Sequence, residues 1–568
     1  MLWCSMKLMI TNTKNRKFLY VAKTFREDGK CTSRIIEKLG TFDELSKIHT
    51  DPIAWAKQYA QNLTEKEKAS NEEILVKFFP AKIIDIGVSN SFNGGYLFLQ
   101  RIYHELNLHK ICNGISNRYK FDFDLDSILS RLIYSRLIHP ASKLATLELS
   151  QKFIQQPNFE LQHIYRALEV IAKESDFIQS ELYINSLDVY KRKAGVLYFD
   201  CTNYFFEIEN ADDEGELRQY GYSKEHRPNP IVQMGLFMDA GGIPLAFSIS
   251  PGNTNEQTTL QPLEQKILDD FKLSKFVVCT DAGLSSFANR KFNNVPNRAF
   301  ITTQSVKKLA GHLKTWALDS KDWRVSGSEK IYDITEAADK ETIFYKQRWI
   351  NENGLSQKLV VTYSLKYKEY QRQIRNAQIE RAKSAIKSGK AEKVNQTNHK
   401  RLIKKTSTTS EGEVAENSIY TIDMELIARE EQYDGYYGIC TNLDDEPTEI
   451  IKVNHRRWEI EECFRIMKNE FKVRPVYLSR DDRIRAHFMT CFITLLIYRL
   501  LEKRLDEKFT YREIIDGLRN MNFQKIRGEG YIPSYTRTNF TDALHEKFGF
   551  RTDYQILTTQ KMKKLTTN

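Results

Sequence analysis

The chain has 568 residues, a formal net charge of +11, and 41% hydrophobic residues. This length exceeds the roughly 250–300 residues at which one core stops growing, so we expect two or more domains with ample apolar content for their cores. No uninterrupted run of about 18 apolar residues occurs, so we expect no transmembrane span.

The N-terminal stretch is partly apolar, but polar residues interrupt it and no small-residue cleavage site follows. We therefore expect a mature N-terminus and a cytoplasmic protein. The eight cysteines are far apart, without a C-x2-C pair or a matching histidine spacing. This argues against a structural zinc site and favours reduced, buried thiols.

The first part of the chain combines a hairpin pattern with a helical one. Residues 18–40 alternate and turn at Asp28-Gly29, which predicts a β-hairpin. Residues 41–80 look helical, with several polar stretches. We group these elements as an N-terminal region spanning 1–90.

A series of helices is predicted next. The helical period recurs from Leu97 to about Tyr190 and is interrupted at Pro140. This defines a helical region at 91–194. Within it, a helix at 161–174 is a candidate for a major-groove reader, although no recognition helix stands out.

At Gly195 the pattern changes to strands. The run GVLYFDCTNYFFEI predicts a first strand, and IVQMGLFMDAGGIPLAFSISPGN predicts two more strands joined by Gly241-Gly242. A helix around Gln257–Asp270 and the strand KFVVCTDAGLSS follow. Strands, a helix and a further strand predict the first part of an α/β core, over 195–300.

Residues 301–440 interrupt this core with strand-like pieces: AFITT, KIYDI, TIFYKQRWI and KLVVTYSL. We interpret them as a mostly β insertion. It contains the segment Lys366–Lys405, with thirteen Lys/Arg against three Glu and therefore a charge of +10. Such density favours a polyanion, most commonly nucleic acid, and the alternative is a lysine-rich surface helix without a partner.

The stretch NHRRWEIEECFRIMK opens the second part of the core, over 441–508. It predicts an amphipathic helix on which one acid lies among bases: Arg457, Glu461, Arg465 and Lys468 follow steps of four, four and three and share a stripe. The simpler interpretation is a solvated helix with ion pairs. The apolar run RIRAHFMTCFITLLIYRLLEKRL predicts a central packing helix, and 509–568 form a tail domain.

Three carboxylates form the candidate site. Asp200 ends the run GVLYFD, Asp281 ends KFVVCTD, and Glu461 lies on the downstream helix. Carboxylates at the tips of buried strands project into the cleft where open α/β sheets bind ligands. Three hard oxygen donors suit Mg²⁺ or Mn²⁺, and paired ions about 3.5–4 Å apart support phosphoryl transfer. Taken singly, each aspartate is better explained as a loop or capping residue.

The chain resembles the insertion-sequence DDE transposases, on the RNase H-like fold shared with retroviral integrases. One branch of that family carries a Y-x2-R-x3-E-x6-K pattern on the helix that supplies the third acid. Here Arg457-x3-Glu461-x6-Lys468 matches that pattern, whereas the tyrosine position holds Asn454. No phenol role therefore carries over to that position, but the metal ligands are unaffected.

The resemblance covers approximately residues 90–510 and makes Asp200 and Asp281 the first and second acids. The stretches RPNPIVQMGLFMD, PGNTNEQ and RPVYLSRDDRIRAHF fit the same family. Its implied fold is an α/β RNase H-like catalytic core with a mostly β insertion before the last catalytic helix, plus a helical N-terminal region.

The implied activity is metal-dependent cleavage at insertion-sequence ends and strand transfer into target DNA. The implied catalytic and metal-binding residues are Asp200, Asp281 and Glu461. The implied DNA-binding residues are Arg457, Arg465 and Lys468. The implied partners are the terminal inverted repeats, the target DNA and further copies of the chain in a homodimer or higher multimer. The protein would then act inside a bacterial cell, associated with the nucleoid when bound to DNA.

Several alternatives stay open. A nuclease of the same fold would hydrolyse nucleic acid without joining it, and an inert relic would only bind DNA. Arg457 and Lys468 grip phosphates in one interpretation and form salt bridges in the other. His487 is a proton carrier or a packed core histidine. Trp323 and Trp349 stack on an unpaired base or pack within the insertion.

Overall fold

The computed structural model describes residues 6–13, 16–27, 30–70, 80–81, 83–391, 399–407 and 418–567. The chain divides into two units, one made of residues 1–88 with 526–529 and the other of residues 89–525 with 530–568.

The first unit contains an antiparallel sheet in the order β1-β2-β3. Its elements are β1 (Met6–Thr13), β2 (Arg16–Glu27), β3 (Lys30–Thr41), α1 (Phe42–Leu45) and α2 (Pro52–Ser70). The β2–β3 pairing continues to Glu27 opposite Lys30, which confirms the predicted hairpin, while its tip, 28–29, lies outside the described residues. Leu19, Leu45 and Ala56 form the small apolar core.

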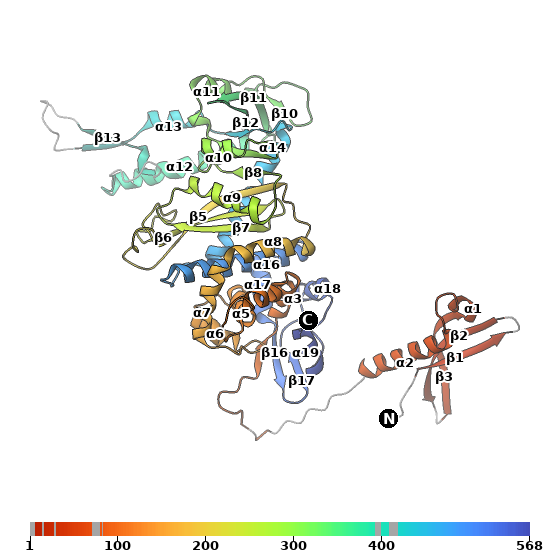
Figure 1. Ribbon diagram of the computed structural model, residues 1–568. Coiled ribbons are helices and arrows are strands. Elements are labelled where there is room, and N and C mark those ends of the chain that lie inside the picture. The colour runs from red at the N-terminus through yellow and green to blue at the C-terminus, as the bar shows by residue number, and fades with distance from the viewer. Residues whose placement is uncertain are drawn as a thin grey trace. The chain divides into compact units, whose positions relative to one another are not determined.

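The second unit begins with the predicted helices. They are α3 (Tyr96–Glu105), α4 (Leu108–Ser116), α5 (Leu125–Ile138), α6 (Lys143–Ser150), α7 (Leu161–Lys173) and α8 (Ser175–Val189). Pro140 separates α5 from α6, because proline lacks the amide that a continuing helix needs. Helices α5 and α7 pack on α16 (Asp481–Arg504), which also contacts the sheet at β7 (Pro244–Pro251) (Figure 1).

Helix α16 is the predicted central packing helix. Among the described residues it is the one helix that is long and apolar enough to cross a membrane, yet 94% of its apolar window is buried inside the protein. A helix that is apolar on all sides and covered by protein is the core of a large domain.

A nine-stranded sheet forms the centre of the second unit, in the order β10-β11-β12-β15-β9-β8-β5-β6-β7. Besides β7, its strands are β5 (Val196–Phe205), β6 (Ile231–Asp239), β8 (Phe276–Thr280), β9 (Arg298–Gln304), β10 (Arg324–Val325), β11 (Phe344–Glu352), β12 (Leu355–Tyr363) and β15 (Tyr436–Thr441). Strand β8 runs parallel to β5 and β9, and the remaining pairs are antiparallel. The strands between 301 and 440 therefore extend the same sheet.

Helices cover the two faces of this sheet. The segments beside it are η1 (Glu256–Thr258), α9 (Leu260–Asp270), α10 (Phe287–Phe292), η2 (Val306–Lys308), α11 (Gly311–Leu318) and η3 (Ile334–Glu336). Helix α9 packs on Phe199 and Phe237, whereas Tyr198 and Tyr204 belong to the core that contains α16. The strand expected at KIYDI is wrong: this stretch makes an isolated bridge from Tyr332 to Trp323 and then the turn η3.

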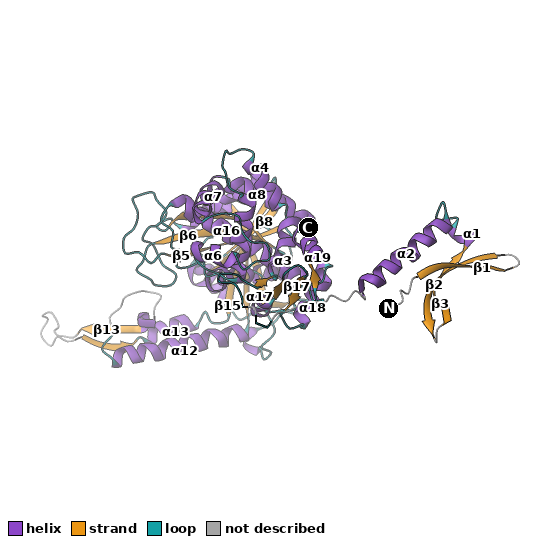
Figure 2. Cartoon of the chain, turned by 90° about the horizontal axis from the view of Figure 1, so that it is seen from below, coloured by secondary structure: helices purple, strands orange, loops and turns teal. Residues whose placement is uncertain are grey.

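Between β12 and β15 the chain forms a helical arm. It consists of α12 (Leu365–Lys387), η4 (His399–Leu402), β13 (Ile403–Ser407), β14 (Ser418–Ile422) and α13 (Met424–Glu431). These elements lie together in both views (Figures 1 and 2) and share the apolar contacts of Ala382, Leu402 and Ile427. Residues 392–398 of the basic segment lie outside the described residues.

The last elements follow β15. They are α14 (Pro447–His455), α15 (Trp458–Arg465), the π-helix η5 (Ile466–Glu470), α16, α17 (Tyr511–Asn520), β16 (Asn522–Ile526), β17 (Gly530–Pro533), α18 (Asn539–Phe548), β18 (Leu557–Thr558) and α19 (Thr559–Thr567). Strand β16 pairs with β4 (Ser91–Asn93), and β17 pairs with β18. The C-terminal tail thereby returns to the start of the second unit.

Candidate active site

Two of the three predicted acids belong to neighbouring parallel strands: Asp200 lies within β5, and Asp281 directly follows β8. The register of β5 and β8 ends with Tyr198 opposite Cys279. Asp200 and Asp281 each lie two residues beyond that pair. Side chains alternate along a strand, so Asp200 lies on the same face of β5 as Tyr198. The charge of Asp281 raises the pKa of Asp200, so the two carboxylates lie near each other.

The sequence predicted that Asp200 lies at a strand tip, and this prediction is wrong. Strand β5 continues to Phe205, because β6 pairs with it as far as Phe205 opposite Ile231. Only the parallel partner β8 stops early, at Thr280, with Asp281 directly after it. Asp200 is therefore held by backbone on both sides, and the place where β8 ends opens the sheet beside it.

The helices that carry Glu461 cover this same face. The Tyr198 hydroxyl donates to the carbonyl of Val453 at 2.9 Å, and the Tyr204 hydroxyl contacts Met467 Sδ at 3.8 Å. These contacts lie on either side of Asp200 along β5. Glu461 lies between Val453 and Met467 in sequence, so the helical segment that carries Glu461 runs along β5.

The predicted single helix from 454 to 468 is divided in the structure. Helix α14 ends at His455, α15 begins at Trp458, and the π-helix η5 follows from Ile466. A π turn carries an extra residue per turn and is often found at functional sites. The predicted stripe of four charged residues is therefore not carried by one continuous α-helix.

The charged residues of the stripe consequently have different partners. Arg457 pairs with Glu461 at 3.7 Å, and Arg465 pairs with Glu462 through Nε at 2.7 Å and with Glu470 at 3.6 Å. Lys468 instead pairs with Glu225 at 3.4 Å and lies over the ring of Tyr204. Arg457 and Lys468 thus face the acids' side of the helix, whereas Arg465 is held by the acids of its own segment.

Burial and charge determine the protonation of this cluster. The pKa of Asp200 is raised to about 6, mainly by burial and also by the charge of Asp281, while Lys224 and Arg457 oppose the rise. Burial lowers the pKa of Lys468 to about 8, and the nearby Lys224 contributes. Arg457, which pairs with Glu461, therefore also acts on Asp200, so the surroundings of all three acids are electrostatically connected. The Glu461 side chain is 61% exposed.

Lys224, which lies between β5 and β6, was not among the residues predicted from the sequence. Its ammonium donates to the carbonyl of Cys201 and pairs with Glu256 at 3.1 Å. Although burial disfavours its charge, Asp200 and Glu256 raise the pKa of Lys224. Buried Asn203 accepts from the Lys224 amide at 3.3 Å, so it positions this loop. The available signal was the charged SKEHR run directly before the RPNPIVQMGLFMD stretch.

Asn454, at the tyrosine position of the motif, has a tyrosine as its hydrogen-bond partner. Asn454 is buried and its amide donates to the hydroxyl of Tyr437 at 3.1 Å, on β15. Tyr437, Tyr367, Trp458 and Glu461 line one pocket of about 630 Å³. The phenol of Tyr437 therefore lies beside Asn454, but it comes from β15 and not from the helical segment that carries the motif. The insertion tryptophans differ: Trp323 is fully buried in the core and Trp349 is about half exposed.

The donor set fits a divalent cation. Asp200 on β5 and Asp281 directly after β8 are two neighbouring carboxylates. Burial and the charge of Asp281 raise the pKa of Asp200, and a cation bound between the two carboxylates would relieve their repulsion. The three acids are not all within 4.8 Å of one another. Carboxylates that bind two metal ions about 3.5–4 Å apart need not all be that close to one another, because they are shared between the two metal ions.

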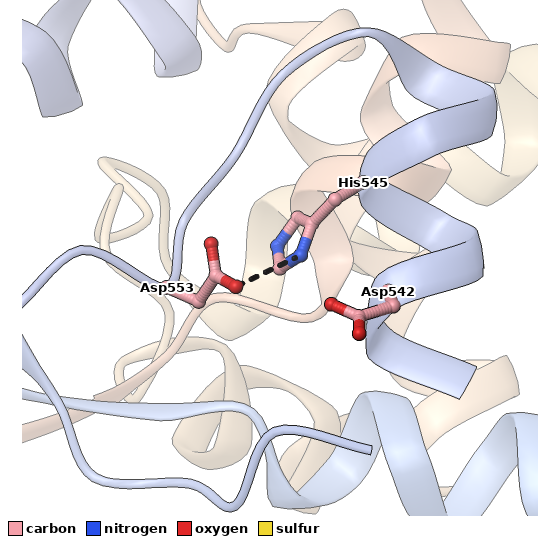
Figure 3. Close-up of side chains that lie close together, drawn as sticks. All are labelled: Asp542, His545 and Asp553. Carbon is pink, nitrogen blue, oxygen red and sulfur yellow. Dashed lines mark ion pairs between the residues drawn. The ribbon is translucent and has the colours of Figure 1, made fainter. Parts of the chain in front are cut away.

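A second acidic cluster lies in the C-terminal tail (Figure 3). Among the described residues, Asp542, His545 and Asp553 are the group whose ligand atoms all lie within 4.8 Å. Arg537 pairs with Asp542 at 2.7 Å, and Arg551 pairs with Asp542 at 3.1 Å and with Asp553 at 2.5 Å. Two arginines already balance two carboxylates, so this cluster is a structural ion network.

Comparison with known proteins gives two family matches. The model of the transposase DDE domain matches residues 210–497, about half of the chain; this range includes Asp281 and Glu461 and begins after Asp200. The model of the IS1634 family transposase N-terminal domain matches residues 8–73. No curated protein matches significantly.

Among solved structures, the chain is similar to a piggyBac transposase synaptic complex with hairpin DNA, determined by cryo-EM. The identity is 8%, the alignment covers 83% of this chain and 84% of that chain, and the TM-score is 0.33.

Asp200→Asn should stabilise the metal-free protein in a pH-dependent way. The folded-state pKa of about 6 lies above the ordinary 3.8, so the native state keeps a proton that the unfolded chain loses. Native stability therefore falls as pH rises from about 4 to 6 and stays lower above that range. We expect Asp200→Asn to raise the free energy of unfolding by on the order of 2 kcal/mol at pH 7.5 and to leave it unchanged at pH 4.

Thermal unfolding in the presence of a chelator measures this difference at both pH values. Asp176→Asn is the matched control, because its carboxylate is 74% exposed and should contribute little at either pH. An equal effect of Asp200→Asn at pH 4 and pH 7.5 would contradict the environment described for Asp200.

Proposed function

The chain belongs to the DDE transposases, and from this premise we propose that Asp200, Asp281 and Glu461 are the acids with which it cuts and joins DNA. The observation that carries the proposal is the β5–β8 register, which leaves Asp200 and Asp281 near each other, with Asp200 on the face that α14 and α15 cover. Membership of the family makes the protein an enzyme that acts on DNA.

We propose that the core is RNase H-like. The strand order β7-β6-β5-β8-β9 supports this, because an antiparallel three-strand meander is continued by two parallel strands. In this arrangement 195–300 and 441–508 supply the catalytic core, and 301–440 are inserted between its last parallel strand and the helix of Glu461. The inserted strands prolong the core sheet, which gives the arm a rigid base.

DDE transposases generally depend on divalent metal, and we propose Mg²⁺ or Mn²⁺ held by the three carboxylates. Such ions activate a water or a 3′-hydroxyl and stabilise the leaving oxygen. Asp200 is fixed within β5, and Asp281 is held after β8 by the Leu284 amide, which donates to its carboxylate at 2.9 Å. The more exposed Glu461 is held by Arg457. Catalysis then consists of positioning and electrostatics, without a covalent enzyme–DNA intermediate.

The surrounding bases have separate proposed roles. Arg457 can exchange Glu461 for a phosphate and hold it in a bidentate way. Lys468 and Lys224 lie beside Asp200 and supply positive charge where phosphates enter. Arg465 would contact DNA only after leaving Glu462 and Glu470, so we assign it the rim of the site.

The proposed substrates are the terminal inverted repeats of the element and a target DNA. Sequence reading is assigned to 1–90 or 91–194, and residues 8–73 match the N-terminal domain of a transposase family. Helix α7 buries Ile164, Ala167 and Leu168, and exposes Gln162, Arg166 and Lys173. We also propose that two or more copies act together on paired ends.

Glu461→Gln should abolish cleavage of element-end DNA. The substitution keeps the shape of the side chain but removes the negative charge that a divalent ion needs. We expect cleavage with Mg²⁺ or Mn²⁺ to fall by more than about 1,000-fold, with DNA binding retained, and Asp200→Asn and Asp281→Asn to behave alike. Double variants should lose little more than single ones, because the three acids act as one unit.

Glu462→Gln is the control for this experiment. It lies next to Glu461, pairs with Arg465, and should retain near-normal cleavage. Cleavage retained by Glu461→Gln and lost by Glu462→Gln would reassign the third acid. A labelled-end joining assay separates a transposase from a nuclease, since only the transposase yields joined product.

The basic arm should bind DNA through its unpaired lysines. Lys387, Lys390 and Lys400 form no ion pair with a described residue, whereas other bases of the segment are already paired with acids. Changing these three to Gln should weaken binding to any duplex. The salt dependence of binding should fall by about one unit for each phosphate that the variant no longer neutralises.

The matched control changes three paired lysines of the same arm: Lys366, Lys383 and Lys404. They pair with Glu341, Glu380 and Glu425 at 2.8, 2.8 and 3.8 Å. Their replacement changes the net charge equally and should reduce the salt slope less. Equal slopes for both triple variants would show that the arm acts only through its total charge.

A further inference from the structure

A second basic site lies away from the three acids, in a pocket of about 280 Å³ between α6, α16 and the loop before α16. Five of its lining residues are basic: Arg136, Lys143, Lys472, Arg474 and His487. No carboxylate is among the described residues that line it. A water molecule takes up about 30 Å³ in the liquid, so the pocket has room for a larger group.

Three of these basic side chains are buried without complete hydrogen bonding. Arg136, Lys143 and His487 are 6%, 6% and 5% exposed. Arg136 Nε, Lys143 Nζ and His487 Nδ1 have no hydrogen-bond partner among the described residues. Buried polar groups are usually paired, and a buried ammonium without a partner is costly. An unpaired set of this kind is what an anion would complete.

Arg136 is held in place by protein carbonyls on its other nitrogens. Its Nη1 donates to Phe471 at 3.2 Å and its Nη2 donates to Ala141 at 3.2 Å. The guanidinium is therefore fixed before any ligand arrives. The pKa of Lys143 is lowered to about 7, mainly by burial and also by the charge of Arg136, so the two side chains repel each other when Lys143 is protonated.

The start of α6 adds a third contribution. Ser142 is the N-cap of this helix, with its hydroxyl accepting from the Ala145 amide at 3.2 Å, and Lys143 is the first helical residue. Ala141, Ser142 and Lys143 line the pocket, so the positive end of the helix dipole faces it. The helix end, the fixed guanidinium and the buried ammonium all favour the same kind of ligand.

The pocket adjoins the acid site through one glutamate. Arg474 lines the pocket and forms an ion pair with Glu225. Glu225 also pairs with Lys468, whose ammonium is close enough to Asp200 for that acid to affect its pKa. A nucleic-acid strand that passes the three acids therefore has a basic path toward the pocket.

We propose that this pocket binds a backbone phosphate of the DNA substrate, with Lys143 and Arg136 as its main ligands. The proposal rests on the proposed action on DNA, but it concerns residues other than the three acids. It assigns the run Pro140-Ala-Ser-Lys143 a role in holding DNA at a fixed distance from the cleavage site. The interaction is with phosphate, so it is independent of base sequence.

Lys143→Met tests the proposal, because methionine keeps the apolar stem and removes the charge. We expect affinity for a random-sequence duplex to fall about 10-fold and the salt slope to fall by about one unit. We expect the folded protein to be at least as stable as the wild type, since a buried unpaired cation is gone. Lys508→Met is the matched control and should change the slope little, because Lys508 is 71% exposed and lies outside the regions assigned to DNA.

A second measurement uses inorganic phosphate to distinguish a site for the DNA backbone phosphate from a site for a small free anion. At constant ionic strength it should raise the melting temperature of the wild type and not that of Lys143→Met. If phosphate acts in this way but Lys143→Met leaves DNA affinity and salt slope unchanged, the pocket is a small-anion site and the DNA assignment is overturned. If neither measurement changes while Lys143→Met folds normally, the pocket binds no phosphate and the proposal fails.

Discussion

The parallel pairing of β5 with β8 is the constraint on which the proposed site depends. Only three residue pairs connect these strands, from Val196 opposite Val277 to Tyr198 opposite Cys279. Where the pairing ends, Asp200 and Asp281 are left near each other. Two carboxylates in this position repel each other, and this repulsion adds to burial in raising the pKa of Asp200. The surrounding bases Lys224 and Arg457 offset part of that repulsion.

A second layer brings α15, which carries the proposed third acid Glu461, against β5. The Tyr198 hydroxyl and the amide of Asn454 attach α14 to β5 and β15, through Val453 and Tyr437. Helix α15 then carries Glu461 along the sheet, and the π-helix after it turns Lys468 toward Glu225. The position of Glu461 is thus set by backbone and hydrogen bonds, while its carboxylate stays exposed enough to change partners.

Local patterns in the sequence were sufficient for much of this. β-branched and aromatic runs predicted β5 to β9, and the apolar helix α16 was confirmed as central. The assignment of the acids, made from their position after such runs, stays a prediction. The errors have tertiary causes. Asp200 is within a strand because β6 continues past β8, which no local pattern contains. KIYDI has strand-forming residues but lacks a neighbouring strand to pair with.

The residues that were missed are those whose role is created by packing. Lys224 is an ordinary loop lysine in sequence, and only the fold places it beside Asp200. Lys143 follows a helix cap, which predicts exposure, yet the chain buries it against Arg136. The break between α14 and η5 is also a tertiary effect, since the helical period of 454–468 is uninterrupted in sequence.

The most direct measurement of the central claim is anomalous diffraction from crystals soaked in Mn²⁺. We predict anomalous peaks bound by Asp200 and Asp281, with Glu461 completing the site, and none at Asp542, His545 and Asp553, where arginines balance the charge. Manganese bound in the C-terminal cluster and absent beside a well-ordered Asp200 would contradict the claim.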